Sequence, residues 1–148
     1  MRVEIKGMDR LELFIKGKVE EELDDIAEYI QSDAVTTLNS SREGNWKTTD
    51  TGYLAKSIEI TSAKFFRRVE VTAPYGEDIE YGTDPHYVPP SILYTWARRK
   101  LRLSDKDAIG ASYAISNKIK KTGTEPQPFW NAAVFKAIAW FKKKRAKW

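Results

Sequence analysis

The chain has 148 residues, which is enough for one domain and too few for a second globular domain of ordinary size. Its 41% hydrophobic and 12% aromatic residues can fill a core, while 31% charged residues and a mean hydropathy of −0.56 exclude collagen-like, low-complexity and membrane-spanning classes. The absence of cysteine excludes a disulfide framework, a thiolate metal site and a cysteine nucleophile. No apolar run reaches signal-peptide length or the about 20 residues that span a bilayer, so we expect synthesis and action in a cytoplasm, with no membrane partner.

The net charge of +4 is unevenly distributed along the chain. Through Ile60 there are 8 Lys/Arg against 13 Asp/Glu, and from Thr61 onward there are 17 against 8. No acidic residue follows Glu125, and residues 142–147 are almost all Lys or Arg. Such a segment attracts nucleic acid or an acidic protein surface. We favour a solvated helix end, where cations suit the negative end of the helix dipole.

The first predicted elements are a short strand and a long helix. Val3 and Ile5 alternate with polar residues as in a strand, whereas residues 11–15 fit either a second strand or a helical turn. From Lys18 to Asn39 apolar residues recur at three- and four-residue spacings, which predicts a helix of about 30 Å. Acidic residues fill the positions between them, so we expect this helix to cross the domain with its acidic face outward.

A turn-rich segment, a hairpin and a short helix are predicted next. Residues 40–52 combine Ser, Gly, Asn and Asp without periodicity, which indicates a loop that carries Trp46. From Ser57 apolar and polar residues alternate, as in two antiparallel strands. The alternating apolar residues are Ile58, Ile60, Val69, Val71 and Ala73. Pro74 is expected to open a short helix that ends near Tyr81, because Pro is favoured at the first helical position.

Three further helices are predicted after a Pro-rich connection at residues 84–90. The first opens at Pro90 or Ser91, and Ser104 is a candidate N-cap for the second, which stops at Gly123. The third follows Pro128. Their apolar positions are Ile92, Leu93, Trp96 and Leu101 on one face of the first, Ala108, Ile109, Ala111, Ala114, Ile115 and Ile119 in the second, and Trp130, Ala133, Val134, Ala137, Ile138 and Phe141 toward the core in the third.

The residue types that catalysis needs do not occur together. His86 is the only histidine, and with Asp84 on a Pro-rich loop it supplies no combined nucleophile, oriented base and oxyanion site. One His with scattered carboxylates has no metal-ligand spacing, and the isolated glycines form no phosphate-binding loop. We therefore expect no enzyme, no cofactor and no metal, and we interpret His86 as a loop residue.

Three short segments stand out from this background, and each has a structural explanation. Gly52 permits a sharp turn, Gly82 lets the chain leave a helix end with positive φ, and Pro128 fixes the entry into the final helix. The residues of this pattern are Thr51, Gly52, Leu54, Ser57 and Ile58 in the first segment, Tyr75, Glu80, Tyr81, Gly82 and Thr83 in the second, and Pro126, Pro128 and Phe129 in the third.

In this order, and in a chain of this size, the three segments resemble the tail components of tailed bacteriophages, the neck or tail-completion proteins. The resemblance covers residues 1–148 and implies a single α+β domain. It implies a long N-terminal helix and a C-terminal helix packed on a small antiparallel sheet, with a helical insertion at residues 84–125. It also implies a non-catalytic virion protein that forms a ring, typically hexameric, between the head connector and the tail tube. The protein would lie at the head–tail junction of the virion, after assembly in the host cytoplasm.

Two hypotheses of different classes follow for the function. The leading one is a head–tail joining ring whose candidate interface comprises Trp46, Tyr87, Arg98, Arg99, Lys100 and Arg102. The alternative is a small nucleic-acid-binding module that uses the same basic residues and the C-terminal lysines, with Trp140 or Trp148 for base stacking. For the ring, we expect the acidic face of the long helix to lie apart from the two basic clusters, which are residues 98–102 and the C-terminal lysines. Unlike patches would then meet between identical neighbours.

Overall fold

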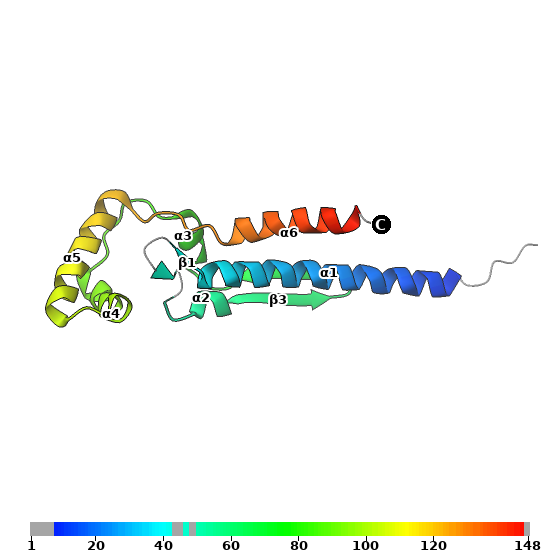
Figure 1. The fold of residues 1–148 in the computed structure, drawn as a ribbon, viewed down its shortest axis with the longest axis horizontal. Coiled ribbons are helices and arrows are strands. Elements are labelled where there is room, and N and C mark those ends of the chain that lie inside the picture. The colour runs from blue at the N-terminus through cyan, green and yellow to red at the C-terminus, as the bar shows by residue number, and fades with distance from the viewer. Residues whose placement is uncertain (1–7, 43–45, 48–49, 147–148) are drawn as a thin grey trace, which may run out of the picture.

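The computed structural model describes residues 8–42, 46–47 and 50–146, so the strand predicted at Val3 and Ile5 lies outside the described residues. The α+β class is confirmed: two long helices, one near each end of the chain, lie beside a small antiparallel sheet (Figure 1). The elements are α1 (Met8–Asn39), β1 (Ser41–Arg42), β2 (Trp46–Lys47), α2 (Tyr53–Lys56), β3 (Ile58–Ala63), β4 (Phe66–Val71), α3 (Gly76–Tyr81), α4 (Pro90–Leu101), α5 (Asp105–Thr122) and α6 (Trp130–Arg145).

Helix α1 is longer than its apolar periodicity predicts. Its 32 residues correspond to a length of about 48 Å. Residues 11–15 belong to this helix, so the helical alternative for that segment is the correct one. Ala27, Ala34 and Leu38 are buried at helical spacing, whereas the side chains of residues 12–17 are exposed. The additional turns therefore have no packed face of their own within the described residues, and they extend beyond the ends of α6 and the β3–β4 hairpin (Figure 1).

The predicted antiparallel hairpin forms. Ile58 pairs with Val71 and Ile60 pairs with Val69, which places these four apolar side chains on one face of the sheet. The two strands are joined at Lys64 and Phe65, and Phe65 adopts a positive φ of 57°. In the segment predicted as a loop, the two-residue strands β1 and β2 pair with each other.

Helix α3 begins two residues later than predicted, at Gly76. The backbone N–H of Gly76 donates to the carbonyl of Ala73, so Pro74 lies inside a tight turn and not at the first helical position. The turn brings the chain from the end of β4 into α3. It also places Ala73 in the core, where it is 5% exposed.

The core is a cluster in which α1, α2, β3 and the start of α6 meet. Its buried members are Ala34, Leu38, Leu54, Ile58, Ala73, Phe129 and Ala133. Phe129 is 1% exposed and covers the core at the entry to the final helix. The core lies toward the C-terminal end of α1.

Helices α4 and α5 pack chiefly on each other at one end of the molecule (Figure 1). Pro90 occupies the first turn of α4, Ser104 caps α5 by accepting a hydrogen bond from the N–H of Asp107 at 3.3 Å, and α5 stops at Gly123, all as predicted. The expected apolar face of α4 is wrong at Ile92, which is 65% exposed. Its exposure follows from the arrangement, because a pair of helices at the end of a molecule has faces that nothing covers. No helix among the described residues has the length and apolar content needed to cross a membrane.

Candidate functional site

Glu80 joins the second and third of the predicted segments. Its side chain is 4% exposed, and its carboxylate accepts hydrogen bonds from the backbone N–H groups of Phe129, Trp130 and Asn131 at 2.7, 2.8 and 3.0 Å. The first N–H groups of a helix have no partner within the helix. Phe129 stands at the N-cap position of α6 and has no side-chain oxygen to cap them. A carboxylate from α3 therefore caps α6, where negative charge also suits the helix dipole.

The first segment joins the other two through apolar packing and backbone hydrogen bonds. Gly52 has a positive φ of 78°, which suits the predicted sharp turn, and precedes the single turn of α2. Leu54 and Ile58 then enter the core beside Phe129. The hydroxyl of Ser57 donates to the carbonyl of Leu54 at 2.8 Å, and the carbonyl of Ser57 accepts from the N–H of Thr72 at 2.9 Å. Thr51 makes the weakest contact, because its hydroxyl accepts from the N–H of Tyr53 at 3.4 Å.

Gly82 lies where the chain enters the α4–α5 pair, beside the point where the chain leaves it. Thr83 and Thr124 exchange two backbone hydrogen bonds of 3.2 Å there. Gly82 has a φ of 74°, and a Cβ on it would stand 2.4 Å from the carbonyl oxygen of Thr124. Gly123 on the other side has a φ of 70°, and its Cβ would stand 1.8 Å from the carbonyl oxygen of Thr83. Both positions therefore require glycine, and Pro126 follows this crossing directly.

The segments predicted from sequence thus come together in space, but most of their chemistry is internal. Thr51, Pro126 and Pro128 are exposed, and the outward aromatic residues are Tyr75 and Tyr81, with exposed fractions of 39% and 63%. Tyr81 accepts a hydrogen bond from the side-chain amide of Asn131 at 3.2 Å, and burial raises the pKa of Tyr75. The capping role of Glu80 was not predicted. A helix that follows Pro128 without Ser, Thr, Asp or Asn at its N-cap was the available signal, because its N–H groups need a partner from elsewhere.

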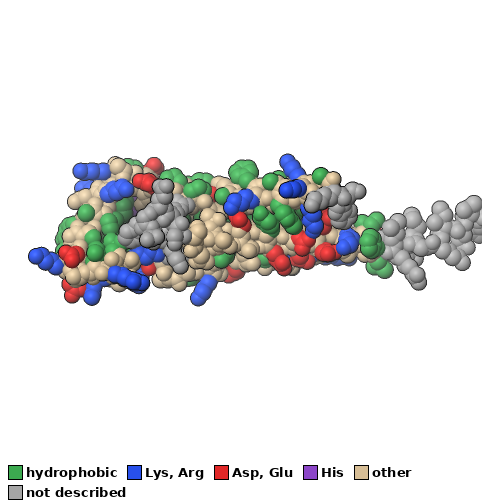
Figure 2. Space-filling model, viewed as in Figure 1, with side chains coloured by type: hydrophobic (Ala, Val, Ile, Leu, Met, Phe, Trp, Pro, Cys, Tyr) green, Lys and Arg blue, Asp and Glu red, His purple; other side chains and the backbone are tan. Residues whose placement is uncertain are grey.

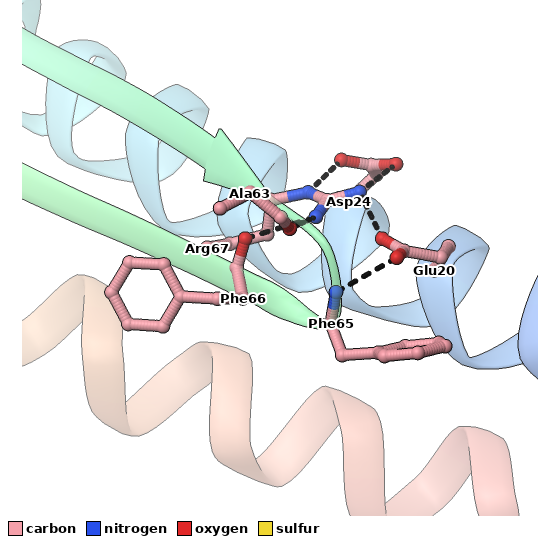
Figure 3. Close-up of polar contacts among 6 residues, drawn as sticks. All are labelled: Glu20, Asp24, Ala63, Phe65, Phe66 and Arg67. Atoms are coloured by element: carbon pink, nitrogen blue, oxygen red, sulfur yellow. Dashed lines mark hydrogen bonds and ion pairs between the residues drawn. The ribbon is translucent and has the colours of Figure 1, made fainter.

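A second polar site, also absent from the sequence prediction, fastens the hairpin tip to α1 (Figure 3). We name it the Arg67 brace, and it comprises Arg67, Glu20 and Asp24. The Arg67 guanidinium binds Asp24 through two nitrogens and lies 2.7 Å from Glu20. It also donates to the carbonyls of Ala63 and Phe66 at 2.8 and 2.9 Å. The Arg67 side chain is 10% exposed, so all of its polar contacts are made within the fold.

The brace also stabilises the unusual backbone at the tip of the hairpin. Glu20 accepts a hydrogen bond of 2.8 Å from the N–H of Phe65, the residue with positive φ. This bond, together with Arg67, holds the pKa of Glu20 below its ordinary value, and the hydrogen bond from Arg67 lowers the pKa of Asp24. The same hydrogen bonds raise the pKa of Arg67. All three groups therefore remain charged over the neutral range.

The residues predicted as a partner interface do not form one continuous basic patch. Arg99 binds Asp50, which lowers the pKa of Asp50 and raises that of Arg99, and Arg98 pairs with Asp105 at 2.9 Å. Arg102 is exposed and has a positive φ of 52°. Tyr87 is 63% exposed, whereas the side chain of Trp46 lies outside the described residues. The interface role of these residues stays a prediction. Two of them, Arg98 and Arg99, bind carboxylates of their own chain.

The expected separation of the acidic helix from the C-terminal lysines is wrong. Lys144 binds Asp25 and Lys136 binds Asp33, so α6 lies along α1 with its cations on the α1 carboxylates. The contact with Asp25 raises the pKa of Lys144. The acidic face of α1 is therefore partly internal, shared between α6 and the Arg67 brace. The basic α4–α5 pair, by contrast, lies at the opposite end of the molecule from the beginning of α1 (Figures 1 and 2).

Large apolar side chains are exposed at both ends of the molecule. Leu13, Phe14 and Ile15 at the beginning of α1 are 70%, 63% and 53% exposed. At the α4–α5 end, Ile92, Ile109 and Tyr113 are 65%, 51% and 59% exposed. Figure 2 shows hydrophobic side chains beside the undescribed residues at the α1 end and basic side chains gathered at the other. Grouped exposure of large apolar side chains indicates contact surfaces.

The side chain of His86 makes only local contacts, whereas its backbone N–H donates to the carbonyl of Ile119 at 3.3 Å. Its Nδ1 lies 2.9 Å from the carbonyl oxygen of Asp84 and 3.3 Å from the hydroxyl of Thr83, on an exposed loop. Among the residues that the structure describes, no three His, Asp or Glu side chains gather in a way that could hold a metal ion. Comparisons of the chain with protein-family models, with curated proteins and with solved structures gave no match.

Proposed function

We propose that the protein is a structural virion protein of a tailed phage or provirus, which forms a ring where head and tail join. It acts through surface contacts and not through chemistry. One observation carries this proposal: an elongated body exposes large apolar side chains at both ends, at Leu13, Phe14 and Ile15 and at Ile92, Ile109 and Tyr113. Two such patches on one chain suit a heterologous contact, which closes into a ring when the rotation between neighbours allows it.

The three segments that resemble phage tail components add support. They are spread over more than seventy residues of sequence, yet they meet around Glu80 and Phe129. The segments depend on one another structurally, because the Glu of one segment caps the helix that follows the Pro-x-Pro-Phe sequence of another. The proposal therefore rests on a connected unit and not on three separate short patterns.

The nucleic-acid alternative loses one of its stacking residues. Trp140 stacks on Tyr29 with ring centroids 5.1 Å apart, and the Lys144 ammonium lies 5.2 Å from the Trp140 ring. The indole is therefore engaged within the fold and not presented for base stacking. The basic α4–α5 end still offers Arg102, Lys106, Lys120 and Lys121, so affinity for DNA needs a direct measurement.

The test is to remove the coding sequence from the viral genome that carries it and to image the particles by electron microscopy. We expect filled heads and separate tails, with joined particles restored by the wild-type gene. Normal virions in the absence of the protein would contradict the proposal. The neighbouring genes give a faster check, because we expect portal, capsid and tail-tube genes on either side.

A matched variant separates assembly from DNA binding. Lys120→Glu with Lys121→Glu reverses two exposed charges in the last turn of α5 and leaves the pairs of Arg98 and Arg99 intact. We expect this variant to restore joining while its retention on DNA falls and becomes less sensitive to salt. Loss of joining in proportion to lost DNA affinity would favour the nucleic-acid function.

A further inference from the structure

The beginning of α1 forms an arm that the rest of the described chain leaves uncovered. We define the arm as residues 12–19, which precede the Arg67 brace at Glu20. Its apolar residues occur on more than one side of the helix, because Leu13, Phe14 and Ile15 are consecutive and each is at least 53% exposed. Grouped, exposed large apolar side chains are a feature of contact surfaces. The arm therefore needs a partner surface.

A groove of matching character lies at the junction of β4, α3 and the start of α6. It has a volume of about 510 Å³, and its apolar lining includes Val71, Ala73, Phe129 and Trp130. Cavities of this size take drug-sized groups, so the groove has room for the side chains of an apolar helix turn. Glu70 and Glu77 also line it, and Glu70 lies directly opposite Glu59 in the hairpin. Like charges at that spacing are unfavourable unless a cation lies near them.

The arm carries the charge that the groove lacks. Lys16 and Lys18 lie among its apolar residues, each in an exposed pair with a glutamate of the same helix. Such pairs are worth only about 0.2–0.5 kcal/mol, so the lysines can exchange partners at little cost. The arm contains two Lys against one Glu, whereas the charged residues that line the groove are all glutamates.

The arm cannot fill the groove of its own chain. Phe14 and Leu38 are separated by about 36 Å along the continuous helix α1. Leu38 belongs to the same core cluster as Ala73 and Phe129, which line the groove. The groove therefore lies near the far end of α1 from the arm, and only a second copy of the chain can bring the two together.

We propose that the arm of one subunit docks in the groove of its neighbour, with Phe14 among the apolar lining and the arm lysines beside Glu70 and Glu77. This contact rests on the proposed function and gives the ring a specific interface. Arm and groove are different patches, so each subunit uses both, and the chain of contacts closes into a ring or continues as a filament. Charge complementarity sets orientation and encounter rate, while burial of Phe14 supplies most of the affinity.

The test uses the absence of cysteine in the wild-type chain. Single-cysteine variants Phe14→Cys and Glu77→Cys of the full-length protein are mixed at high concentration and oxidised. We expect a disulfide-linked dimer that contains one chain of each kind, at several times the yield obtained from either variant alone. The matched control replaces Glu77→Cys with Lys120→Cys, an exposed position on α5, and we expect only background cross-linking with Phe14→Cys.

Three outcomes would overturn the docking proposal. Dimers of Phe14→Cys alone would show arm-to-arm pairing, equal yields with Lys120→Cys would show unspecific collision, and the absence of cross-links would show that no such contact forms. Both variants change exposed side chains, so urea unfolding serves to confirm that each is folded. If cross-linking fails while particles without the protein still remain unjoined, the docking proposal is wrong and the proposed function stands. If particles are joined without the protein while the cross-link forms, the function is wrong and the contact stands.

Discussion

The region around Glu80 and the arm of α1 use similar residue types in opposite ways. Around Glu80, the carboxylate is buried and three helix N–H groups bind it, so polar and apolar groups find partners in the same chain. In the arm, Phe14 and its apolar neighbours face solvent and the lysines make only exposed pairs. The first region determines the fold, and the second has the properties of a surface that a partner covers. Changes in the first should therefore affect stability, and changes in the second should affect assembly.

The largest expected effect is that of Glu80→Ala. The variant leaves three N–H groups at the start of α6 without their acceptor, and hydrogen bonds to a charged group are worth about 1.5–3 kcal/mol each. We expect the free energy of unfolding, measured in urea, to fall by about 3 kcal/mol or more. Glu77→Ala on the same helix is the control, because its exposed side chain should change stability by less than about 0.5 kcal/mol. Equal effects of the two variants would refute the capping role.

The next largest effects are expected at the positive-φ glycines. Gly52→Val should cost about 1–2 kcal/mol, because a β-branched residue is strained in the left-handed region. Gly82→Val should cost more, since its Cβ also meets the Thr124 carbonyl. Gly17→Ala in α1 is the matched control, where φ is ordinary and no atom lies near; it should stabilise by about 0.5–1 kcal/mol. Equal losses of stability at Gly52 and Gly82 would show that the backbone pair of Thr83 and Thr124 shifts to accommodate the added side chain.

A smaller effect is expected from pH through the Arg67 brace. The pKa values of Glu20 and Asp24 are held below their ordinary values in the folded state, so their stabilising contribution is complete at neutral pH, well above those ordinary values. It is lost as the pH falls through the lowered folded-state values. We expect the stability difference between the wild type and Arg67→Gln to be constant over the neutral range and to shrink in acid. A difference that grows on acidification would contradict the brace.

The smallest expected effect is that of His86→Ala. The histidine is exposed and its side chain contacts only its own loop, so stability and joining of head to tail should be unchanged. A folded variant that leaves heads and tails unjoined would show that His86 lies in an assembly contact.

Local patterns explain which parts of the fold were predictable. Alternation placed Ile58 and Ile60 in the hairpin, and Ser104 with Gly123 marked both ends of α5, because these signals depend on neighbouring residues alone. The roles of Glu80 and Arg67 were not predicted, because their partners are distant in sequence. The N–H groups that Glu80 binds are 49 or more residues away, and Asp24, which Arg67 binds, is 43 residues away. The pairing of the C-terminal lysines with α1 was not predicted for the same reason, because it depends on how α6 packs. Ile92 fits an apolar helix face in sequence, yet no element among the described residues covers it.

The most direct measurement is the mass of the chain in solution, by sedimentation velocity, for the wild type and Phe14→Ser at the same concentration. Because Phe14 is 63% exposed, the variant should fold as the wild type does, and its unfolding midpoint should be lower only by the stabilisation that association adds to the wild type. We expect the wild type to sediment as an oligomer and Phe14→Ser as a monomer. Equal masses for the two proteins, with equal stability, would contradict the assignment of the arm to assembly.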